Sequence, residues 1–380
     1  MSGEQGTERY DVVIIGAGQA GLAAGYHLAK RGIQFLILED HERIGDNWRT
    51  RWESLRLYSP AAVDGLPGMR FPAKRFAYPS GREMGDYLES YARAWKLPVR
   101  TGIHVDRLRR RDDGRDGFVI EAGDQRFEAD QVIVATGAFQ KPHVPDFAGE
   151  LDPGIRQLHS SAYRSPSQLQ DGPVLVVGAS HSGADIAVEA AAGGHRTVLA
   201  GHILAQLPVP LESRRGQTIM PIMFLLAKYL LTIRTPIGRK MVPRVRMGGG
   251  PLLRVRRPDL DRAGVERSEA RVQGVSGGKP VLGDGRTIDV ANVVWCTGFR
   301  PDFRWIEMPI VDADGWPVQT RGVVDSVPGL YFLGLLFQYS FTSVLVGGAS
   351  RDAAYVVDRI AERAAAETSP TRLAARVARS

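Results

Sequence analysis

The first part of the chain alternates short apolar runs with a helical pattern. Asp11–Ile15 is a mostly β-branched run that stops at Gly16, and after Gly21 the apolar residues recur at the spacing of a helix. A second apolar run, Phe35–Leu38, follows that helix. A strand, a helix and a strand in this order predict a βαβ unit.

The same order of elements returns in the middle of the chain. Val174–Val177 is an apolar run that stops at a glycine, a small-residue helix is expected over Ala184–Ala192, and Thr197–Ala200 forms the next run. Two further buried strands, within Val132–Gly137 and Val293–Gly298, each end in Thr-Gly. We therefore expect an α/β fold with two Rossmann-like dinucleotide-binding domains.

Proline and glycine mark the crossings between these two domains. Gln140–Pro153 and Ser165–Pro173 are rich in both residues, which indicates the exit from the first domain. The return is expected near Gly298–Pro301. The second domain is thus inserted into the first, and we expect the first domain over residues 1–164 and 294–380 and the second over residues 165–293.

One segment departs from this pattern. Ile219–Ile233 is almost wholly apolar and is flanked by basic residues such as Arg214, Arg215 and Arg234. It is too short to span a bilayer. We expect a buried or dimer-facing helix of the second domain, or else a helix that contacts a membrane surface or borders the entry of substrate.

The composition is that of a globular protein, with 43% hydrophobic and 24% charged residues. The net charge of +7 is spread along the chain without interleaved aromatic residues, which argues against nucleic-acid binding. A single cysteine, Cys296, excludes an intramolecular disulfide and, with a polar N-terminus, predicts a cytoplasmic location. The eight His show no ligand spacing, so no metal is expected.

A G-x-G-x-x-G motif made of Gly16, Gly18 and Gly21 joins the first strand to the first helix. Gly16 turns the chain, Gly18 lets the backbone approach a pyrophosphate, and Gly21 admits close helix packing, while the helix N-terminus favours negative charge. Glu39, at the end of the next strand, offers a carboxylate to ribose hydroxyls and would repel a 2′-phosphate. The first site is therefore predicted to bind FAD or NAD.

The turn after the second predicted strand carries a family resemblance. Gly45–Arg49, with Trp48, resembles the flavin-contacting segment of flavin-containing monooxygenases, Ala135–Gly137 and Cys296–Gly298 resemble their paired interdomain motifs, and Pro328–Gly334 is similar to their late flavin-binding strand. The resemblance is closest to the smaller heteroatom oxygenases and YUCCA-like enzymes, and it implies FAD in the first domain. The cofactor contacts expected besides Trp48 are Val105, Thr136, Thr297, Gly298 and Gly334.

A second glycine motif, G-x-S-x-S-G, opens the second βαβ unit. Ser180 replaces the middle glycine, so a bound pyrophosphate must tolerate its side chain or accept a hydrogen bond from it. His202 stands where the resembling family usually places an Arg for the 2′-phosphate of NADPH, and a protonated imidazole can bind that phosphate. We expect NADPH to contact Gly178, Ser180, His181, Ser182, Gly183 and His202.

Two side chains are candidates for catalytic contacts with the flavin. Tyr58 stands where classical members of the family carry an Asn, and its hydroxyl either donates to oxygenated flavin or substrate or belongs to apolar packing. Gln338 matches a loop that borders the flavin ring in the family, the alternative being a solvent-facing loop. His159 is expected to be a hinge residue whose ring bonds nearby backbone.

The resemblance implies an FAD- and NADPH-dependent monooxygenase. NADPH would reduce FAD, O₂ would add to give a C4a-hydroperoxide, and one oxygen atom would pass to a heteroatom or carbonyl group of a small organic substrate. A second hypothesis is an NAD(P)H-dependent flavoprotein reductase or electron-transfer protein without oxygenation. A third is a flavoprotein whose helix at residues 219–233 binds lipid or a partner in response to the redox state of the flavin.

Overall fold

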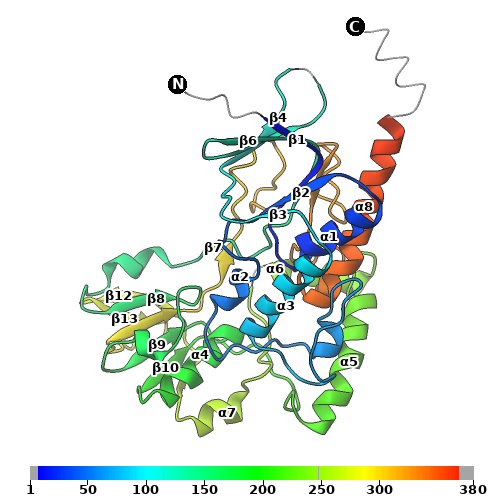
Figure 1. Ribbon diagram of the computed structural model, residues 1–380. Helices are drawn as coiled ribbons and strands as arrows, with labels where there is room; N and C mark the ends of the chain where they lie inside the picture. The colour runs from blue at the N-terminus through cyan, green and yellow to red at the C-terminus, as the bar shows by residue number, and fades with distance from the viewer. Residues whose placement is uncertain (1–6, 114, 247, 368–380) are drawn as a thin grey trace.

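The computed structural model describes residues 7–113, 115–246 and 248–367 of the chain. It contains two sheets of mainly parallel strands, one in the upper part of Figure 1 and one at the lower left, each packed against helices. This arrangement agrees with the expected α/β fold of two Rossmann-like domains.

The first sheet is built around β1 (Glu8–Ile15), which pairs in parallel with β2 (Phe35–Leu38) on one side and β6 (Gln125–Val134) on the other. Residues 12–15 of β1 are all buried because they lie at the centre of the sheet. The sheet is completed by β3 (Val99–Arg100), β4 (Arg107–Arg110), β5 (Phe118–Ala122) and β16 (Leu330–Phe332).

Helices pack beside this sheet. α1 (Gln19–Lys30) contacts α3 (Gly81–Ala94) and runs along α8 (Val346–Glu367). α3 begins at a capping box in which Ser80 accepts from the Glu83 backbone and Glu83 accepts from the Ser80 backbone. The short helix α2 (Asp46–Arg49) lies against α3, which brings the Trp48 turn next to the first domain's core.

The second sheet has the order β11, β10, β9, β14, β8, and all its pairings are parallel. α4 (His181–Ala192) packs on β9 and β10, and α7 (Arg257–Arg262) packs on α4. The strands are β8 (Arg156–His159), β9 (Val174–Val177), β10 (Thr197–Ala200), β11 (Glu266–Ser268) and β14 (Asn292–Trp295), with a separate hairpin of β12 (Val272–Ser276) and β13 (Lys279–Leu282).

The strand β8 bears on the predicted domain limits. It precedes residue 164, where the first domain was expected to end, yet it pairs with β14 in the second sheet. The second sheet therefore takes a strand from the chain ahead of the proline-rich exit. The domain limits themselves stay a prediction.

The two crossings between the domains lie side by side. β7 (Lys141–Pro142) pairs antiparallel with β15 (Phe299–Arg300), and β7 lies between the two lobes in Figure 1. The ring of His159 joins this connection, because its Nε2 donates to the carbonyl of Gly298 at 3.0 Å and its Nδ1 accepts from the backbone of Ser161 at 3.1 Å. His159 therefore bonds nearby backbone, as expected of a hinge residue.

The apolar segment Ile219–Ile233 is partly exposed, with six of its fifteen residues exposed and eight half-buried. Most of it belongs to α5 (Arg214–Tyr229), which is followed by α6 (Pro236–Arg246), and Thr232 is its one buried residue. The expectation of a buried helix is therefore wrong, because α5 packs on the chain along one face only, against η4 (Phe341–Val344), Leu207–Leu211 and the start of α8. The other 3-10 helices are η1 (Ala61–Val63), η2 (Asp146–Glu150) and η3 (Pro166–Gln168). Across the described ranges, no helix has both the length and the apolar character to cross a bilayer.

Candidate functional site

The first glycine loop lies at the carboxyl end of β1. Gly16 has a φ of +107°, and a Cβ atom there would lie 2.7 Å from the Ala135 carbonyl oxygen. A Cβ on Gly21 would lie 1.9 Å from the Gly16 carbonyl oxygen, so this glycine lets α1 approach the loop. A Cβ on Gly18 would meet nothing nearer than the side chain of Asn47 at 3.7 Å, which leaves open space for a pyrophosphate.

The start of α1 is suited to an anion. Gly18 is its N-cap, no side chain caps it, and its first turn contains no acidic residue. Glu39 at the end of β2 is 8% exposed and accepts the backbone N–H of Ala17 at 2.6 Å, so its carboxylate lies directly beside the loop. It also accepts from His41 Nδ1 at 2.7 Å, which raises the pKa of His41.

The other residues predicted for the flavin surround this loop. The positive-φ Gly334, after β16, lies with its Cβ position 3.3 Å from Ala20 in α1 and 3.9 Å from Gly137 after β6. Thr136 is exposed at the same edge and accepts from Gln140 Nε2 at 2.8 Å. The ends of β6 and β16 and the start of α1 therefore meet, as a flavin site requires.

Trp48 and Val105 lie on two segments next to the first domain's core. Trp48 is half-buried, and its Nε1 is a buried donor without a partner in the described structure. Such a donor is available to a ligand. Val105 packs against the apolar core just after Ile103, whose N–H bonds the Glu39 carbonyl at 2.8 Å.

Gln338 is buried rather than solvent-facing, with 1% exposure. Its Nε2 donates to the Phe332 carbonyl at 3.0 Å and its Oε1 accepts from the Leu335 backbone at 3.4 Å. The amide thus shapes the loop that follows Gly334. A catalytic contact from Gln338 stays a prediction.

The second glycine loop has the same geometry as the first. Gly178 has a φ of +109°, and a Cβ there would lie 2.3 Å from the Cys296 carbonyl oxygen. A Cβ on Gly183 would lie 1.8 Å from the Gly178 carbonyl oxygen. The start of α4 likewise has no side-chain cap and no acidic residue in its first turn, which contains Ser182. Both loops are therefore built to receive a phosphate group.

Ser180 and His181 contact a glycine segment that follows α6. The Ser180 hydroxyl accepts from the Gly250 N–H at 2.9 Å and donates to the Gly250 carbonyl at 3.1 Å. A Cβ on Gly250 would lie 2.4 Å from the His181 ring. Burial lowers the pKa of His181 to about 4, so its imidazole is neutral at pH 7. In this structure the Ser180 hydroxyl is thus used within the protein.

Tyr58 lies at the contact between the two domains. Its hydroxyl donates to Asp185 Oδ2 in α4 at 3.1 Å, and its ring centroid lies 5.1 Å from that of His181. Asp185 is 3% exposed and pairs with Arg254 at 3.4 Å. Burial and the neighbouring Asp185 carboxylate raise the pKa of Tyr58 well above its usual value. Tyr58 is thus a hydrogen-bonded link between the domains.

The last three predicted cofactor contacts, His202, Thr297 and Gly298, lie outside the two glycine loops. His202 is exposed after β10, and its Nδ1 lies 2.7 Å from Glu269 Oε2, so an acidic group stands beside the imidazole. Thr297 donates its hydroxyl to the carbonyl of His143, and the Gly298 carbonyl accepts the N–H of His143 at 2.9 Å. Thr297 and Gly298 therefore hold the crossing between the domains together.

Sequence reasoning missed four residues near the second loop, namely Asp185, Gly250, Arg254 and Glu269. Asp185 follows His181 by four positions, and this helical spacing predicts that both face the same neighbour. The other three reach the loop through long-range contacts, for which the sequence has no local signal.

Two dinucleotide loops joined by a short paired connection define a protein of the class of flavoprotein oxidoreductases that take electrons from a nicotinamide. A family model described as pyridine nucleotide-disulphide oxidoreductase matches residues 13–203. An uncharacterized CzcO-like oxidoreductase of Geobacillus kaustophilus is 38% identical over 351 residues, which cover 92% of this chain and 98% of that protein. The chain belongs to the pyridine nucleotide-disulphide oxidoreductase family.

Two further likenesses concern monooxygenases. The probable indole-3-pyruvate monooxygenase YUCCA1 of Arabidopsis thaliana is 27% identical over 324 residues, covering 78% of this chain and 77% of that protein. The structure of a flavin-containing monooxygenase from Stenotrophomonas maltophilia aligns with a TM-score of 0.73 at 27% identity, covering 94% of this chain and 100% of that chain. The predicted family resemblance, fold and enzyme class are therefore confirmed, and FAD and NADPH are the cofactors of an enzyme of this class.

Two glycine substitutions should separate folding from FAD binding. Gly21→Ala places a Cβ atom 1.9 Å from a carbonyl oxygen, so we expect the protein to lose about 2 kcal/mol or more of folding stability. Gly18→Ala fits the backbone, whose φ is −72°, and the space around it, so the Tm of the FAD-free protein should stay unchanged while FAD affinity falls. Thermal unfolding and flavin fluorescence titration measure the two effects. Normal FAD affinity in the Gly18 variant would show that no pyrophosphate approaches this loop.

Proposed function

We propose that the chain is a cytoplasmic FAD- and NADPH-dependent monooxygenase that transfers one oxygen atom from O₂ to a heteroatom or carbonyl group of a small organic substrate, by way of a flavin C4a-hydroperoxide. NADPH supplies two electrons, one oxygen atom enters the product and the other leaves as water. The observation that carries the proposal is the pair of matching glycine loops, each opening an uncapped helix. FAD fits the loop beside Glu39, and NADPH fits the loop at Gly178.

The single cysteine favours oxygenation over disulfide reduction. Reduction of a disulfide through an internal dithiol needs two cysteines, and this chain has Cys296 alone. Burial raises the pKa of Cys296 far above its usual value, so the side chain stays a thiol rather than a reactive thiolate. The chemistry of such a site must therefore come from the flavin.

A water-poor contact between the domains supports the proposal. Trp52, Leu55 and Leu57 belong to one buried apolar cluster together with Ala17 of the first loop and Ala179 of the second. Oxygenated flavin decays to oxidised flavin and hydrogen peroxide when water reaches it, so a packed apolar segment between the loops protects the reaction.

One observation favours the alternative, an NAD(P)H-dependent flavoprotein reductase. The Tyr58 hydroxyl is engaged with Asp185 and so is not free to donate to oxygenated flavin in this arrangement. A chain that lacks such a donor can reduce its flavin and pass the electrons on without inserting oxygen.

Stopped-flow absorbance distinguishes the two functions. The FAD-loaded protein is reduced anaerobically with NADPH and then mixed with oxygenated buffer. We expect a band at shorter wavelength than that of oxidised flavin, lasting for seconds or longer, because the site excludes water. Immediate return of the oxidised spectrum, with hydrogen peroxide equal to the NADPH consumed, would contradict oxygenation and support the reductase.

Tyr58→Phe should slow flavin reduction more than the reaction with O₂. It removes a hydrogen bond to a buried carboxylate between the domains, and we expect the rate of flavin reduction by NADPH to fall about tenfold. Asp185→Asn should give the same defect. Tyr91→Phe, which loses a buried hydroxyl bonded to the Pro67 carbonyl, serves as the control. If only the lifetime of oxygenated flavin changes, Tyr58 acts on the flavin instead.

The preference for NADPH over NADH should depend on the pair His202 and Glu269. The Glu269 carboxylate holds the His202 ring at 2.7 Å and would repel a 2′-phosphate. Glu269→Gln should therefore raise the ratio of kcat/KM for NADPH to that for NADH. The increase should be only about three- to tenfold, because the pair is exposed and solvent screens its charges. Glu266→Gln, whose carboxylate pairs with Arg196, is the matched control. An unchanged ratio in Glu269→Gln would place the 2′-phosphate elsewhere.

A further inference from the structure

The helices α5 and α6 present an unusual surface, here called the α5–α6 surface and comprising residues 213–246. Among the described residues, thirteen large hydrophobic side chains are exposed, and seven of them lie on this surface. They are Ile222 (56% exposed), Met223 (40%), Leu225 (56%), Leu226 (48%), Tyr229 (61%), Leu230 (52%) and Ile237 (63%). Scattered exposed apolar residues need no explanation, but a contiguous group of them indicates a binding surface.

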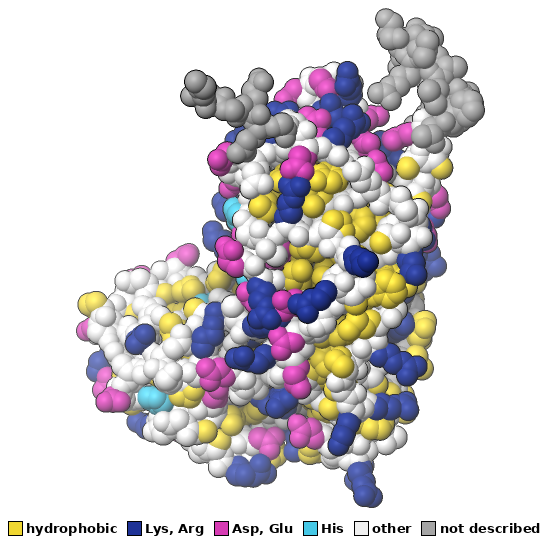
Figure 2. Space-filling view, viewed as in Figure 1, with side chains coloured by type: hydrophobic (Ala, Val, Ile, Leu, Met, Phe, Trp, Pro, Cys, Tyr) yellow, Lys and Arg dark blue, Asp and Glu magenta, His cyan; other side chains and the backbone are white. Residues whose placement is uncertain are grey.

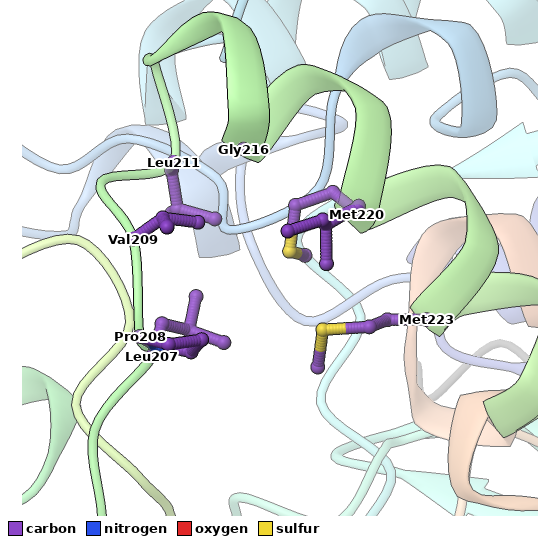
Figure 3. Close-up of a pocket in the computed structure, with 8 residues that line it drawn as sticks. Leu207, Pro208, Val209, Leu211, Gly216, Met220 and Met223 are labelled. Atoms are coloured by element: carbon purple, nitrogen blue, oxygen red, sulfur yellow. The ribbon is translucent and has the colours of Figure 1, made fainter.

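Apart from Met223, which is exposed and also packs on the chain, the exposed residues are not the ones that hold α5 in place. Met220 and Met223 face residues Leu207–Leu211 across a small apolar pocket (Figure 3), and Phe224 lies next to Gly347 of α8. The spacing of Ile222, Leu226 and Leu230 puts these residues on one outer face. About half of each of these side chains is exposed, so a large part of their apolar surface has no partner in the described structure.

The chain holds this surface firmly against the first domain. The Lys228 carbonyl accepts from Arg351 at 3.1 Å, the Leu231 carbonyl accepts from the Phe341 backbone at 2.9 Å, and the Ile233 N–H donates to the Tyr339 carbonyl at 2.9 Å. The apolar side chains are thus presented on a fixed support.

The chain around this surface is also strongly basic. Residues 213–258 contain eleven Lys and Arg and no Asp or Glu, so the rest of the chain, with 38 basic and 42 acidic side chains, is slightly acidic. Arg214, Arg215, Arg234, Arg239 and Lys240 are exposed around the apolar stripe. Figure 2 shows hydrophobic and basic side chains next to each other over α5, at the lower right. The positive net charge of the protein therefore comes from this region.

We propose that the α5–α6 surface docks the enzyme on an anionic lipid bilayer. Helices that lie in the membrane interface combine an exposed apolar stripe with Lys and Arg at its borders. The apolar side chains enter the boundary of the acyl chains, and the basic ones attract anionic headgroups. The inference is independent of the reaction proposed above.

A second copy of the chain fits this surface less well. In a two-fold symmetric dimer the same patch contacts itself, so the basic residues of one copy would face those of the other. No acidic residue within residues 213–258 is present to offset that repulsion. An anionic bilayer neutralises the same charges.

Vesicle flotation tests the proposal with the full-length, FAD-loaded protein. We expect about tenfold more protein bound to phosphatidylcholine vesicles with about 30% phosphatidylserine than to phosphatidylcholine alone, and loss of binding at high salt. No binding to anionic vesicles, or equal binding to both, would overturn it. The rate of NADPH oxidation by the same protein preparation, measured without vesicles, shows separately whether the enzyme is active.

Two variants test the two halves of the surface. Leu226→Ser/Leu230→Ser removes exposed apolar groups, and Arg239→Gln/Lys240→Gln removes exposed charge, so each should lower binding about tenfold without changing Tm. Val318→Ser and Arg82→Gln/Arg93→Gln are matched exposed controls that should bind normally. Equal loss in variants and controls would overturn the proposal. So would light scattering that shows a dimer dissociated by the leucine substitutions, which would assign the surface to self-association.

Discussion

The close approach of a helix to a carbonyl oxygen determines both nucleotide sites. Gly21 in α1 and Gly183 in α4 each lie so near the carbonyl of the preceding loop glycine that any Cβ atom would overlap it. This contact brings the uncapped start of each helix to the carboxyl end of a buried strand. The backbone N–H groups and the helix dipole then point to one place, which suits a phosphate group. The rest of each domain supports this small arrangement.

The position of the two sites relative to each other depends on a second set of contacts. The crossings β7 and β15 pair with each other, and His159 and Thr297 bond the same connection. Tyr58, from the first domain, adds a buried hydrogen bond to Asp185 in the second. Electron transfer from one bound cofactor to another needs such a fixed distance and orientation. These polar contacts therefore join the two domains and fix how they lie relative to each other.

The sequence allowed the glycine loops and their strands to be predicted because their requirements are local. A β-branched run that ends in a glycine and precedes a helical pattern has one common structural solution. The extension of β1 to Glu8 and the membership of β8 in the second sheet could not be predicted, because each depends on a partner strand far along the chain. The exposure of α5 was only one of two alternatives that the sequence left open, since apolar residues alone do not tell a buried helix from a surface one.

Two side chains at the contact between the domains, His181 and Tyr58, keep a fixed charge near neutral pH. Burial keeps the His181 imidazole neutral by lowering its pKa to about 4, and burial together with Asp185 raises the pKa of the Tyr58 hydroxyl well above its usual value. The Asp185 carboxylate has Arg254 as its cationic partner. Burial raises the pKa of Asp185 itself, so the fixed charge states at this contact are those of His181 and Tyr58. Their arrangement suits a protein that orients its cofactors and leaves the bond-making steps to them.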